Sequence, residues 1–341
     1  MKFIPELAGL RGLAACMVFI VHAALDGFFP VITTKYYGKI GLICFFILSG
    51  YLIAQVYLDK PFTKTNIRAY LIARIARIIP LYFFIIFISW FISLFIYPEF
   101  HYDFHDPGKI LSSILLISSP YEPWTIPVEI HFYICFVLFW YLYQSRKINL
   151  KFLFILFFSS VLPSIIYLYL FHKVPRVFSS FSIFFFAGVL ISVLHNNRTF
   201  EKLKEIIPSY VSIFFLILVA VLFPVARSKF GFIYLGTWYD PIMITIVVFL
   251  FILVISKPND FYLLKSKPLI FMSEISYGFY LIHRPVMKII IGNFGISLIS
   301  ALLILIISVS LGYLSYRLIE IPFRNGIEKY FRKQVLNSDS N

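Results

Sequence analysis

Long apolar runs separated by short polar segments make up almost the whole chain. An α-helix needs about 20 residues to cross the hydrocarbon core of a bilayer, and most of these runs approach that length. The pattern predicts ten spans, at residues 7–29, 40–58, 78–97, 126–143, 152–171, 181–195, 209–225, 240–256, 273–292 and 297–316. The apolar segment 110–119 is too short to cross, so we expect it to be a re-entrant or interfacial part of the connection 98–125.

The composition excludes a water-soluble domain. Hydrophobic residues make up 60% of the chain, charged residues only 13%, and the mean hydropathy is +0.89. These values predict an all-α polytopic membrane protein with about ten transmembrane helices. The three cysteines fall inside apolar spans, where they predict neither a disulfide framework nor a thiolate metal site.

The basic balance follows the predicted topology. A formal charge of +14 would suggest nucleic acid as a partner of a soluble protein. With the N-terminus inside, however, the loops alternate between rich and poor in Lys and Arg, and most of the 30 basic residues fall inside. We therefore expect cytoplasmic N- and C-termini and no nucleic-acid partner. Residues 1–325 are expected to form one transmembrane domain, beginning with a retained first helix, and residues 326–341 a short cytoplasmic tail.

The first span carries two ionisable residues, Arg11 and His22. Eleven helical steps of about 100° return to within about 20° of the starting face, so the two side chains share one side, roughly 16 Å apart along the axis. Such residues at bilayer depth are costly and suggest a functional stripe. Alternatively, Arg11 extends to the headgroups and His22 is a satisfied core histidine.

The next two spans add small and basic residues. Ser49-Gly50 places a small polar turn of helix near the middle of the second span, where helix backbones can approach closely, and packing alone can explain it. Arg74 and Arg77 lie three residues apart, on one face, where the third helix leaves the cytoplasm. Two guanidinium groups on one face suit phosphate binding, although anchoring at the cytoplasmic boundary would select the same residues.

Two parts of the outer connection carry polar groups. Residues 101–106 include His101 and His105, which could bind a metal on a helix, but no helix is expected before Pro107, so a solvated loop is preferred. Further on, Trp124 precedes the fourth span and Glu129 lies just inside it. A carboxylate there can serve as an acid or base in a cavity, or only complement the helix N-terminus.

The ninth span concentrates hydroxyl, imidazole and guanidinium groups ahead of a helix breaker. Ser276, Tyr280 and His283 fall near one face, with Tyr277 and Arg284 beside them. Pro285 frees a backbone carbonyl, which a neighbouring helix or a polar cavity must satisfy. After the tenth span, charged residues form a cytoplasmic exit for which pairing rather than catalysis is expected. They are Arg317, Glu320 and Arg324.

The order of these motifs resembles the membrane acyltransferase family 3, integral-membrane O-acyltransferases that modify bacterial surface glycans. The resemblance covers nearly the whole chain and rests on five motifs. They are Arg11-x10-His22, the Phe-Phe-x-Leu-Ser-Gly-Tyr run at 45–51, Arg74-x-x-Arg77, Trp124-Thr-x-x-x-Glu129 and Ser276-Tyr-x-x-Tyr-x-x-His283. Thr125 stands where Ser is common, and no extra esterase-like domain of the kind that some relatives carry is expected.

The resemblance implies transfer of an acyl group, expected to be acetyl, from cytoplasmic acetyl-CoA to a hydroxyl of a cell-surface carbohydrate such as lipopolysaccharide O-antigen or an exopolysaccharide. The expected location is the bacterial plasma membrane, and no metal is expected. Donor phosphates are expected at Arg11, Arg74 and Arg77. Catalytic roles fall to His22, as general base or covalent acyl relay, and to Glu129 and His283. Substrate positioning is expected of Ser49, Trp124, Tyr277 and Tyr280.

A transporter or flippase of a lipid-linked glycan is the alternative, because it too needs ionisable residues and a broken helix within the membrane. The polar residues cluster on four or five spans without repeated halves, which favours the enzyme.

Overall fold

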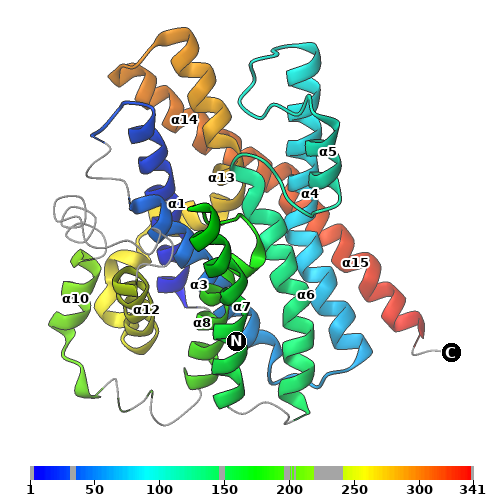
Figure 1. The fold of residues 1–341 in the computed structure, drawn as a ribbon, viewed down its shortest axis with the longest axis vertical. Helices are drawn as coiled ribbons and strands as arrows, with labels where there is room; N and C mark the ends of the chain where they lie inside the picture. The colour runs from blue at the N-terminus through cyan, green and yellow to red at the C-terminus, as the bar shows by residue number, and fades with distance from the viewer. Residues whose placement is uncertain are drawn as a thin grey trace. The chain divides into compact units, whose positions relative to one another are not determined.

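The computed structural model describes residues 4–30, 36–145, 150–195, 205–218 and 241–338, together with residues 200 and 202, and these residues contain helices and no strand (Figure 1). The helices are α1 (Pro5–Leu25), α3 (Tyr37–Tyr57), α4 (Lys64–Phe95), α5 (Pro107–Ile114), α6 (Thr125–Gln144), α7 (Leu150–Phe171), α8 (Phe178–His195), α10 (Ser209–Ile217), α12 (Pro241–Ser256), α13 (Lys267–Phe294), α14 (Leu298–Ser315) and α15 (Ile321–Ser338). Two 3₁₀ helices, η1 (Glu122–Trp124) and η3 (Pro258–Lys265), and a π-helical turn, η4 (Tyr316–Glu320), complete the set.

A helix overlaps each of the ten predicted spans. Within the described part of the chain, six helices are long and apolar enough to cross a membrane, and a bent pair formed by α12 and η3, with a 99° break, brings the number to seven. The all-helical, multi-pass character is therefore confirmed, while the number ten and the inward direction of both termini stay predictions. The end of the seventh predicted span, residues 219–225, lies outside the described residues. The segment near residues 110–119 contains only the eight-residue helix α5.

The third helix differs most from its predicted span. It begins at Lys64 instead of residue 78, with Thr63 as its N-cap, whose side chain accepts from the Asn66 N–H at 3.3 Å. The hydropathy pattern misses this beginning because basic residues interrupt the apolar ones there. The predicted span placed Arg74 and Arg77 just before the helix, at its cytoplasmic start. In the structure, both lie well inside α4.

The chain divides into two compact units, which are described separately. Unit 1 contains Met1–Val56, Ile155–Pro175 and Ser179–Ser276. Unit 2 contains Tyr57–Phe154, Arg176–Phe178 and Tyr277–Asn341. Helix α13 contributes residues to both. The single transmembrane domain expected over residues 1–325 stays a prediction.

In unit 1, close backbone approach holds helices together. A Cβ on Gly50 of α3 would lie 2.0 Å from the Phe185 carbonyl oxygen, and one on Gly188 of α8 would lie 2.1 Å from the Ile47 carbonyl oxygen. Any side chain at either position would push the two helices apart, so the packing interpretation of the Ser49-Gly50 turn is confirmed for the glycine. Helix α1 packs against η3 and is fixed there by an ion pair, 2.8 Å long, between the buried Glu6 and Lys265.

In unit 2, an aromatic core joins α6 to the first half of α4. The Tyr70 hydroxyl donates to the Tyr133 carbonyl oxygen at 3.0 Å, and Trp140 Nε1 donates to the Lys60 carbonyl oxygen at 2.9 Å. The rings of Tyr70, Phe136 and Trp140 are almost fully buried, and the Tyr70 ring contacts the other two. Polar atoms of these large side chains are thus paired while their rings fill the core. This packing places the start of α6, with Glu129, beside the inner part of α4.

Candidate functional site

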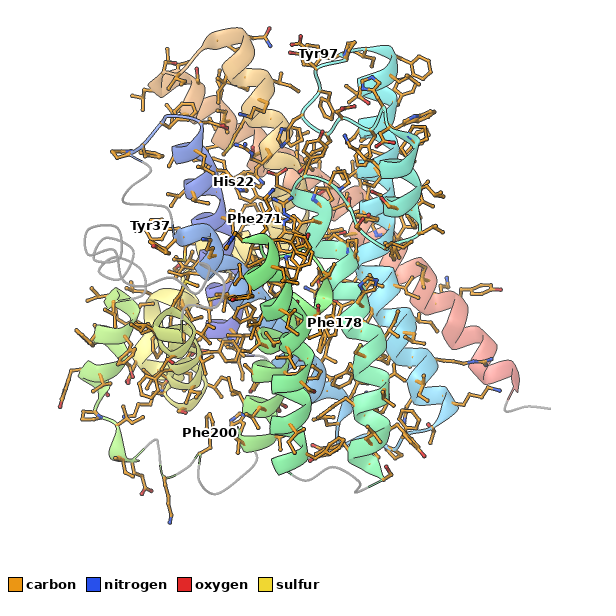
Figure 2. The ribbon with its side chains drawn as sticks, viewed as in Figure 1. His22, Tyr37, Tyr97, Phe178, Phe200 and Phe271 are labelled. Carbon is orange, nitrogen blue, oxygen red and sulfur yellow. The ribbon has the colours of Figure 1, made fainter. Side chains whose placement is uncertain are left out.

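Three of the predicted site residues belong to unit 1. Arg11 and His22 lie on one uninterrupted helix, α1, so their shared face is confirmed. Both side chains are half-buried and both make contacts with other groups. Figure 2 shows His22 on α1. Ser49 on α3 is also half-buried. Their catalytic, donor-binding and positioning roles stay predictions.

In unit 2, predicted donor-binding and catalytic residues lie in one neighbourhood. Tyr133 of α6 donates its hydroxyl to Glu129 Oε1 at 2.5 Å, and the charges of Arg74 and Arg77 act on the same hydroxyl. The Tyr277 hydroxyl of α13 donates to the Ile78 carbonyl oxygen of α4 at 2.7 Å. Tyr277 also interacts electrostatically with Glu129 and with Glu320 at the end of η4. We call this group the arginine cluster: Arg74, Arg77, Glu129, Tyr133, Tyr277 and Glu320.

The arginine cluster changes one expectation from the sequence. Arg74 and Arg77 were expected near the cytoplasmic boundary and Glu129 near the outer one, which a hydrocarbon core of about 30 Å would keep far apart. Instead, Glu129 and both guanidinium groups act on a single hydroxyl, that of Tyr133. The reason is that α4 begins at Lys64 and not at residue 78, and the bond from Tyr70 to the Tyr133 carbonyl places this first part of α4 beside the start of α6.

Two buried atoms of the arginine cluster lack hydrogen bonds. Within the described residues, Arg74 Nε has no acceptor and Glu320 Oε1 has no donor, although both atoms are shielded from solvent. Most buried polar groups in proteins are paired, so such exceptions commonly mark a place for water, an ion or a ligand. A guanidinium donor and a carboxylate acceptor left open in one cluster therefore make it the strongest candidate ligand site of unit 2.

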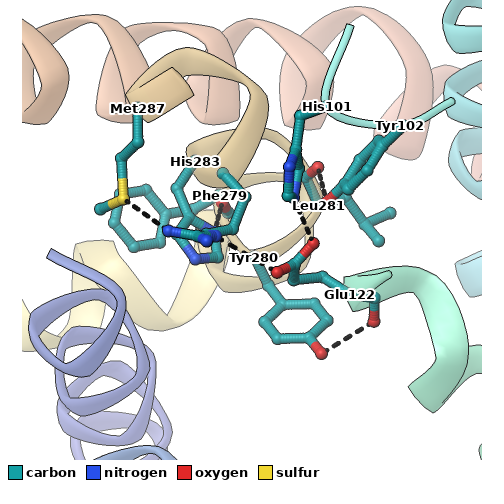
Figure 3. Close-up of polar contacts among 9 residues, drawn as sticks. His101, Tyr102, Glu122, Phe279, Tyr280, Leu281, His283 and Met287 are labelled. Atoms are coloured by element: carbon teal, nitrogen blue, oxygen red, sulfur yellow. Dashed lines mark hydrogen bonds and ion pairs between the residues drawn. The ribbon is translucent and has the colours of Figure 1, made fainter. Parts of the chain in front are cut away.

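A second polar group surrounds Glu122 of η1 (Figure 3). His101 Nε2 lies 3.0 Å from Glu122 Oε2. Arg284 Nε lies 3.3 Å from Glu122 Oε1. The two groups form an ion pair but not a hydrogen bond. The Tyr280 hydroxyl donates to the Glu122 carbonyl oxygen at 2.9 Å. With Tyr102, these residues form the Glu122 cluster, in which the side chains of His101, Glu122 and Arg284 are only 11–14% exposed.

The proline of α13 explains why Tyr102 belongs to this group. Pro285 has no N–H, so the carbonyl of Leu281, four residues earlier, loses its helical partner. The hydroxyl of the fully buried Tyr102 donates to that carbonyl oxygen at 2.9 Å. The expectation that a neighbouring group satisfies a carbonyl freed by Pro285 is confirmed. Burial raises the pKa of Tyr102 well above its ordinary value, and the Glu122 charge adds to it, so the hydroxyl stays a donor.

His283 lies beside the Glu122 cluster, nearly fully buried. Its Nδ1 lies 3.0 Å from the Phe279 carbonyl oxygen. Because a carbonyl can only accept, the proton of this bond is on Nδ1, and the basic position of the neutral ring is Nε2. This tautomer leaves Nε2 for the catalytic role predicted for His283, and that role stays a prediction. Trp124, the other predicted residue of this region, is buried under the Arg176 guanidinium, 5.6 Å from its ring centroid.

The loop before α5 is not the solvated loop expected. His101 is held by Glu122, and Tyr102 and Phe104 are fully buried. Only the end of this loop is exposed, and there the His105 N–H donates to Asp103 Oδ1 at 2.9 Å. This hydrogen bond is the largest cause that lowers the pKa of Asp103. In the described part of the chain, no group of three or more His, Cys, Asp or Glu could hold a metal ion.

Three residues were missed as members of the site. Tyr133 lies four residues after Glu129, and the helical spacing could have identified it. Glu320 was expected only to pair, and it does interact with Arg324, but its interaction with Arg77 had no signal in the sequence. The sequence also gave no signal for Glu122, because its partners His101 and Arg284 come from a loop and from a helix far away in the chain.

These features define a multi-pass membrane protein that keeps arginine, carboxylate and imidazole groups within its helices. Such groups are expensive in a membrane and are normally functional. Residues 4–317 match the acyltransferase 3 family, described as an acyltransferase domain, and the chain belongs to this family. It is an acyltransferase that transfers a group other than an aminoacyl group.

The chain is similar to "Putative acetyltransferase ORF330" of Acidianus two-tailed virus, at 28% identity over 86% of each chain. It is also similar to "Peptidoglycan O-acetyltransferase OatA" of Listeria monocytogenes, at 25% identity over 97% of this chain and 57% of the relative. The chain thus spans a little over half the length of the Listeria protein. No solved structure matches it.

Proposed function

We propose that this acyltransferase moves an acetyl group from cytoplasmic acetyl-CoA to a hydroxyl of a cell-surface glycan. The observation that carries the proposal is the arginine cluster, where two half-buried guanidinium groups lie with a carboxylate and a buried donor atom, Arg74 Nε, has no acceptor among the described residues. Phosphate oxygens are the ligands that such a pair binds best. The name of the Listeria relative supports a cell-envelope glycan as acceptor.

In the proposed reaction, Arg11, Arg74 and Arg77 hold the phosphates of the donor. His22 removes the proton from the acceptor hydroxyl, whose oxygen attacks the thioester carbonyl carbon. The C–S bond then breaks, and the coenzyme A sulfur leaves and takes up a proton. In the covalent variant, His22 attacks first and passes the acyl group to the hydroxyl in a second step.

Residues of unit 2 have supporting roles in this proposal. Glu129 orients Tyr133 and balances the charge of the arginines beside the donor. His283 offers Nε2 as a base or, once protonated, as a donor to the developing oxyanion. Trp124, Tyr277 and Tyr280 position substrate, as does Ser49 of unit 1. The protein is proposed to cross the bacterial plasma membrane about ten times, with both termini in the cytoplasm.

The test is acetyl transfer by the purified protein in lipid nanodiscs. Labelled acetyl-CoA is supplied with an envelope glycan fraction, and the label on the glycan is counted. His22→Ala should lower transfer by about 10³-fold, since it removes a general base or a nucleophile. The matched control is His172→Asn, an exposed histidine with a positive φ of 52°, a conformation that asparagine tolerates. Full transfer by His22→Ala, or glycan movement without any acyl donor, would overturn the proposal.

A further inference from the structure

We propose that Glu320 is the resident counter-ion of Arg77 and that an anionic, phosphate-bearing ligand displaces it when it binds. The inference rests on the proposed function in one respect, the identity of that ligand as acetyl-CoA. The notion of a displaceable carboxylate depends only on the arginine cluster.

The backbone brings Glu320 to the arginine pair through an unusual turn. Glu320 is the last residue of the π-helical turn η4, between α14 and α15, and α4 packs against both η4 and α15. On the other side lies α13, where a Cβ on Gly278 would lie 3.3 Å from Glu320 Oε1. Turns of π-helix are rare and are frequent at functional sites. The carboxylate is therefore enclosed by three helices, and a glycine leaves it the space.

Charge explains why the carboxylate stays there. Arg77 and Arg324 both act on Glu320, and Arg324 is exposed, so Arg77 is its main partner away from solvent. A half-buried guanidinium group needs a counter-charge, because removing it from water without one is costly. Glu320 supplies that charge as long as no other anion is present.

The hydrogen bonds show that this arrangement is incomplete. Within the chain as described, Glu320 Oε1 has no partner of good hydrogen-bond geometry, although the Gly278 N–H acts on the carboxylate, and Arg74 Nε, one turn before Arg77, reaches no acceptor. A well-made structural ion pair would satisfy both atoms. A phosphate bridging Arg74 and Arg77 would satisfy the open donor, but its negative charge would repel the Glu320 carboxylate. The two anions therefore compete for Arg77, and the protein's own anion lowers the affinity for the ligand.

The test is the affinity of the purified full-length protein in nanodiscs for two probes, coenzyme A and inorganic pyrophosphate. Glu320→Gln removes the competing charge and keeps the side-chain size. It should bind both probes about tenfold more tightly than the wild type, since electrostatic repulsion of a neighbouring anion is lost. Its melting temperature without probe should be lower, and the rise on adding probe should be larger. A merely structural role for Glu320 would give weaker or unchanged binding.

The matched control is Glu6→Gln. Glu6 is also a buried carboxylate in an ion pair, with Lys265, but it belongs to unit 1 and not to the arginine cluster. This variant should lose melting temperature while both dissociation constants stay within about twofold of the wild type, because the anion site is unchanged. Arg77→Ala should bind both probes at least tenfold more weakly, since a guanidinium contact to phosphate is lost.

Each outcome bears on one proposal or the other. Equal or weaker binding by Glu320→Gln, with loss of binding in Arg77→Ala, overturns the counter-ion role and leaves the donor site intact. Tighter pyrophosphate binding with no coenzyme A binding by any variant supports the counter-ion and overturns the donor. If neither probe binds the wild type or Glu320→Gln, both proposals fail. If Glu320→Gln does not fold, Glu320→Asp decides, because its shortened carboxylate pairs less closely with Arg77 and should bind both probes more tightly.

Discussion

The arginine cluster and the Glu122 cluster are made of the same kinds of group, yet they differ in how completely those groups are paired. Around Glu122, His101 and Arg284 hold one carboxylate oxygen each, and the backbone carbonyl accepts from Tyr280. In the arginine cluster, Arg74 Nε and Glu320 Oε1 meet no hydrogen-bond partner and no close ion-pair partner within the described chain. Arg284 Nε of the Glu122 cluster also makes no hydrogen bond, but it lies 3.3 Å from the oppositely charged Glu122 Oε1. The Glu122 cluster holds a loop against α13, and the arginine cluster is the one for which we propose a ligand.

The comparison shows that counting charged residues does not identify a binding site in a membrane protein. Both clusters would be noticed by charge alone. What separates them is whether each buried polar atom has an oppositely charged partner at close range, since a buried polar group without a partner costs about 1–3 kcal/mol unless a ligand supplies one. Changes in the arginine cluster should therefore affect substrate binding, and changes in the Glu122 cluster should affect folding.

Among the changes that test the comparison between the two clusters, the largest effect is expected for Arg74→Ala. The variant loses a guanidinium contact that we propose for the donor phosphates, so kcat/KM for acetyl-CoA should fall about 10²-fold, mostly through KM, with an unchanged melting temperature. Steady-state transfer at varied acetyl-CoA measures this. Arg68→Ala is the control, because Arg68 is exposed on the same helix, and it should stay within about twofold of the wild type. A melting temperature that falls while KM is unchanged would contradict the distinction between the clusters.

The next effect is expected for Glu122→Ala. It leaves the largely buried Arg284 and His101 without their carboxylate, which should lower the free energy of unfolding by about 3 kcal/mol. Denaturant titration in detergent measures the loss. Per folded molecule, transfer should remain within about threefold of the wild type, because the Glu122 side chain clamps the loop to α13, while the bond from Tyr280 goes to the Glu122 backbone carbonyl, which the substitution keeps. Intact stability with abolished transfer would place Glu122 in the chemistry instead.

Tyr102→Phe should have a smaller effect on stability. The Leu281 carbonyl then has no donor, which costs about 1–2 kcal/mol. Pro285→Ala restores an N–H to the helix at the position that can bond this carbonyl, so Tyr102→Phe should cost less in a Pro285→Ala background. A double-mutant cycle of unfolding free energies gives the coupling. Additive losses would show that the tyrosine hydroxyl does not compensate for the proline.

The smallest effect is expected for Asp103→Asn at the exposed end of the same loop. Its lowered pKa means that the carboxylate stabilises the fold above its unfolded pKa, about 3.9, and that this contribution is lost as the pH falls through the lower folded value. Wild type and variant should therefore differ by a constant amount between about pH 5 and 8, no more than about 2 °C in melting temperature. The difference should vanish once the pH has fallen below the folded pKa of Asp103. A difference that changes near neutral pH would contradict this.

The helices could be predicted from the sequence because each apolar run is long, and a helix overlaps each of the ten predicted ranges. The beginning of α4 could not, since basic residues interrupt the apolar pattern before residue 78, and that shift moved Arg74 and Arg77 into the helix. The hydroxyl of Tyr102 could not be foreseen either. Pro285 indicated that a partner for the Leu281 carbonyl must exist, but the partner comes from an aperiodic loop far away in the chain. Helical spacing finds neighbours within an element, such as Glu129 and Tyr133, and tertiary packing alone decides the others.

The hydrogen bond between Tyr102 and the Leu281 carbonyl also predicts that positions 102 and 285, far apart in the sequence, constrain each other's evolution. As long as a proline occupies position 285, the hydroxyl at position 102 fills a gap in the helix and is under selection. A descendant that exchanges the proline regains the amide donor, and the loop residue is then free to drift. Positions 102 and 285 should accordingly covary among related sequences, with the tyrosine lost only where the proline has already gone.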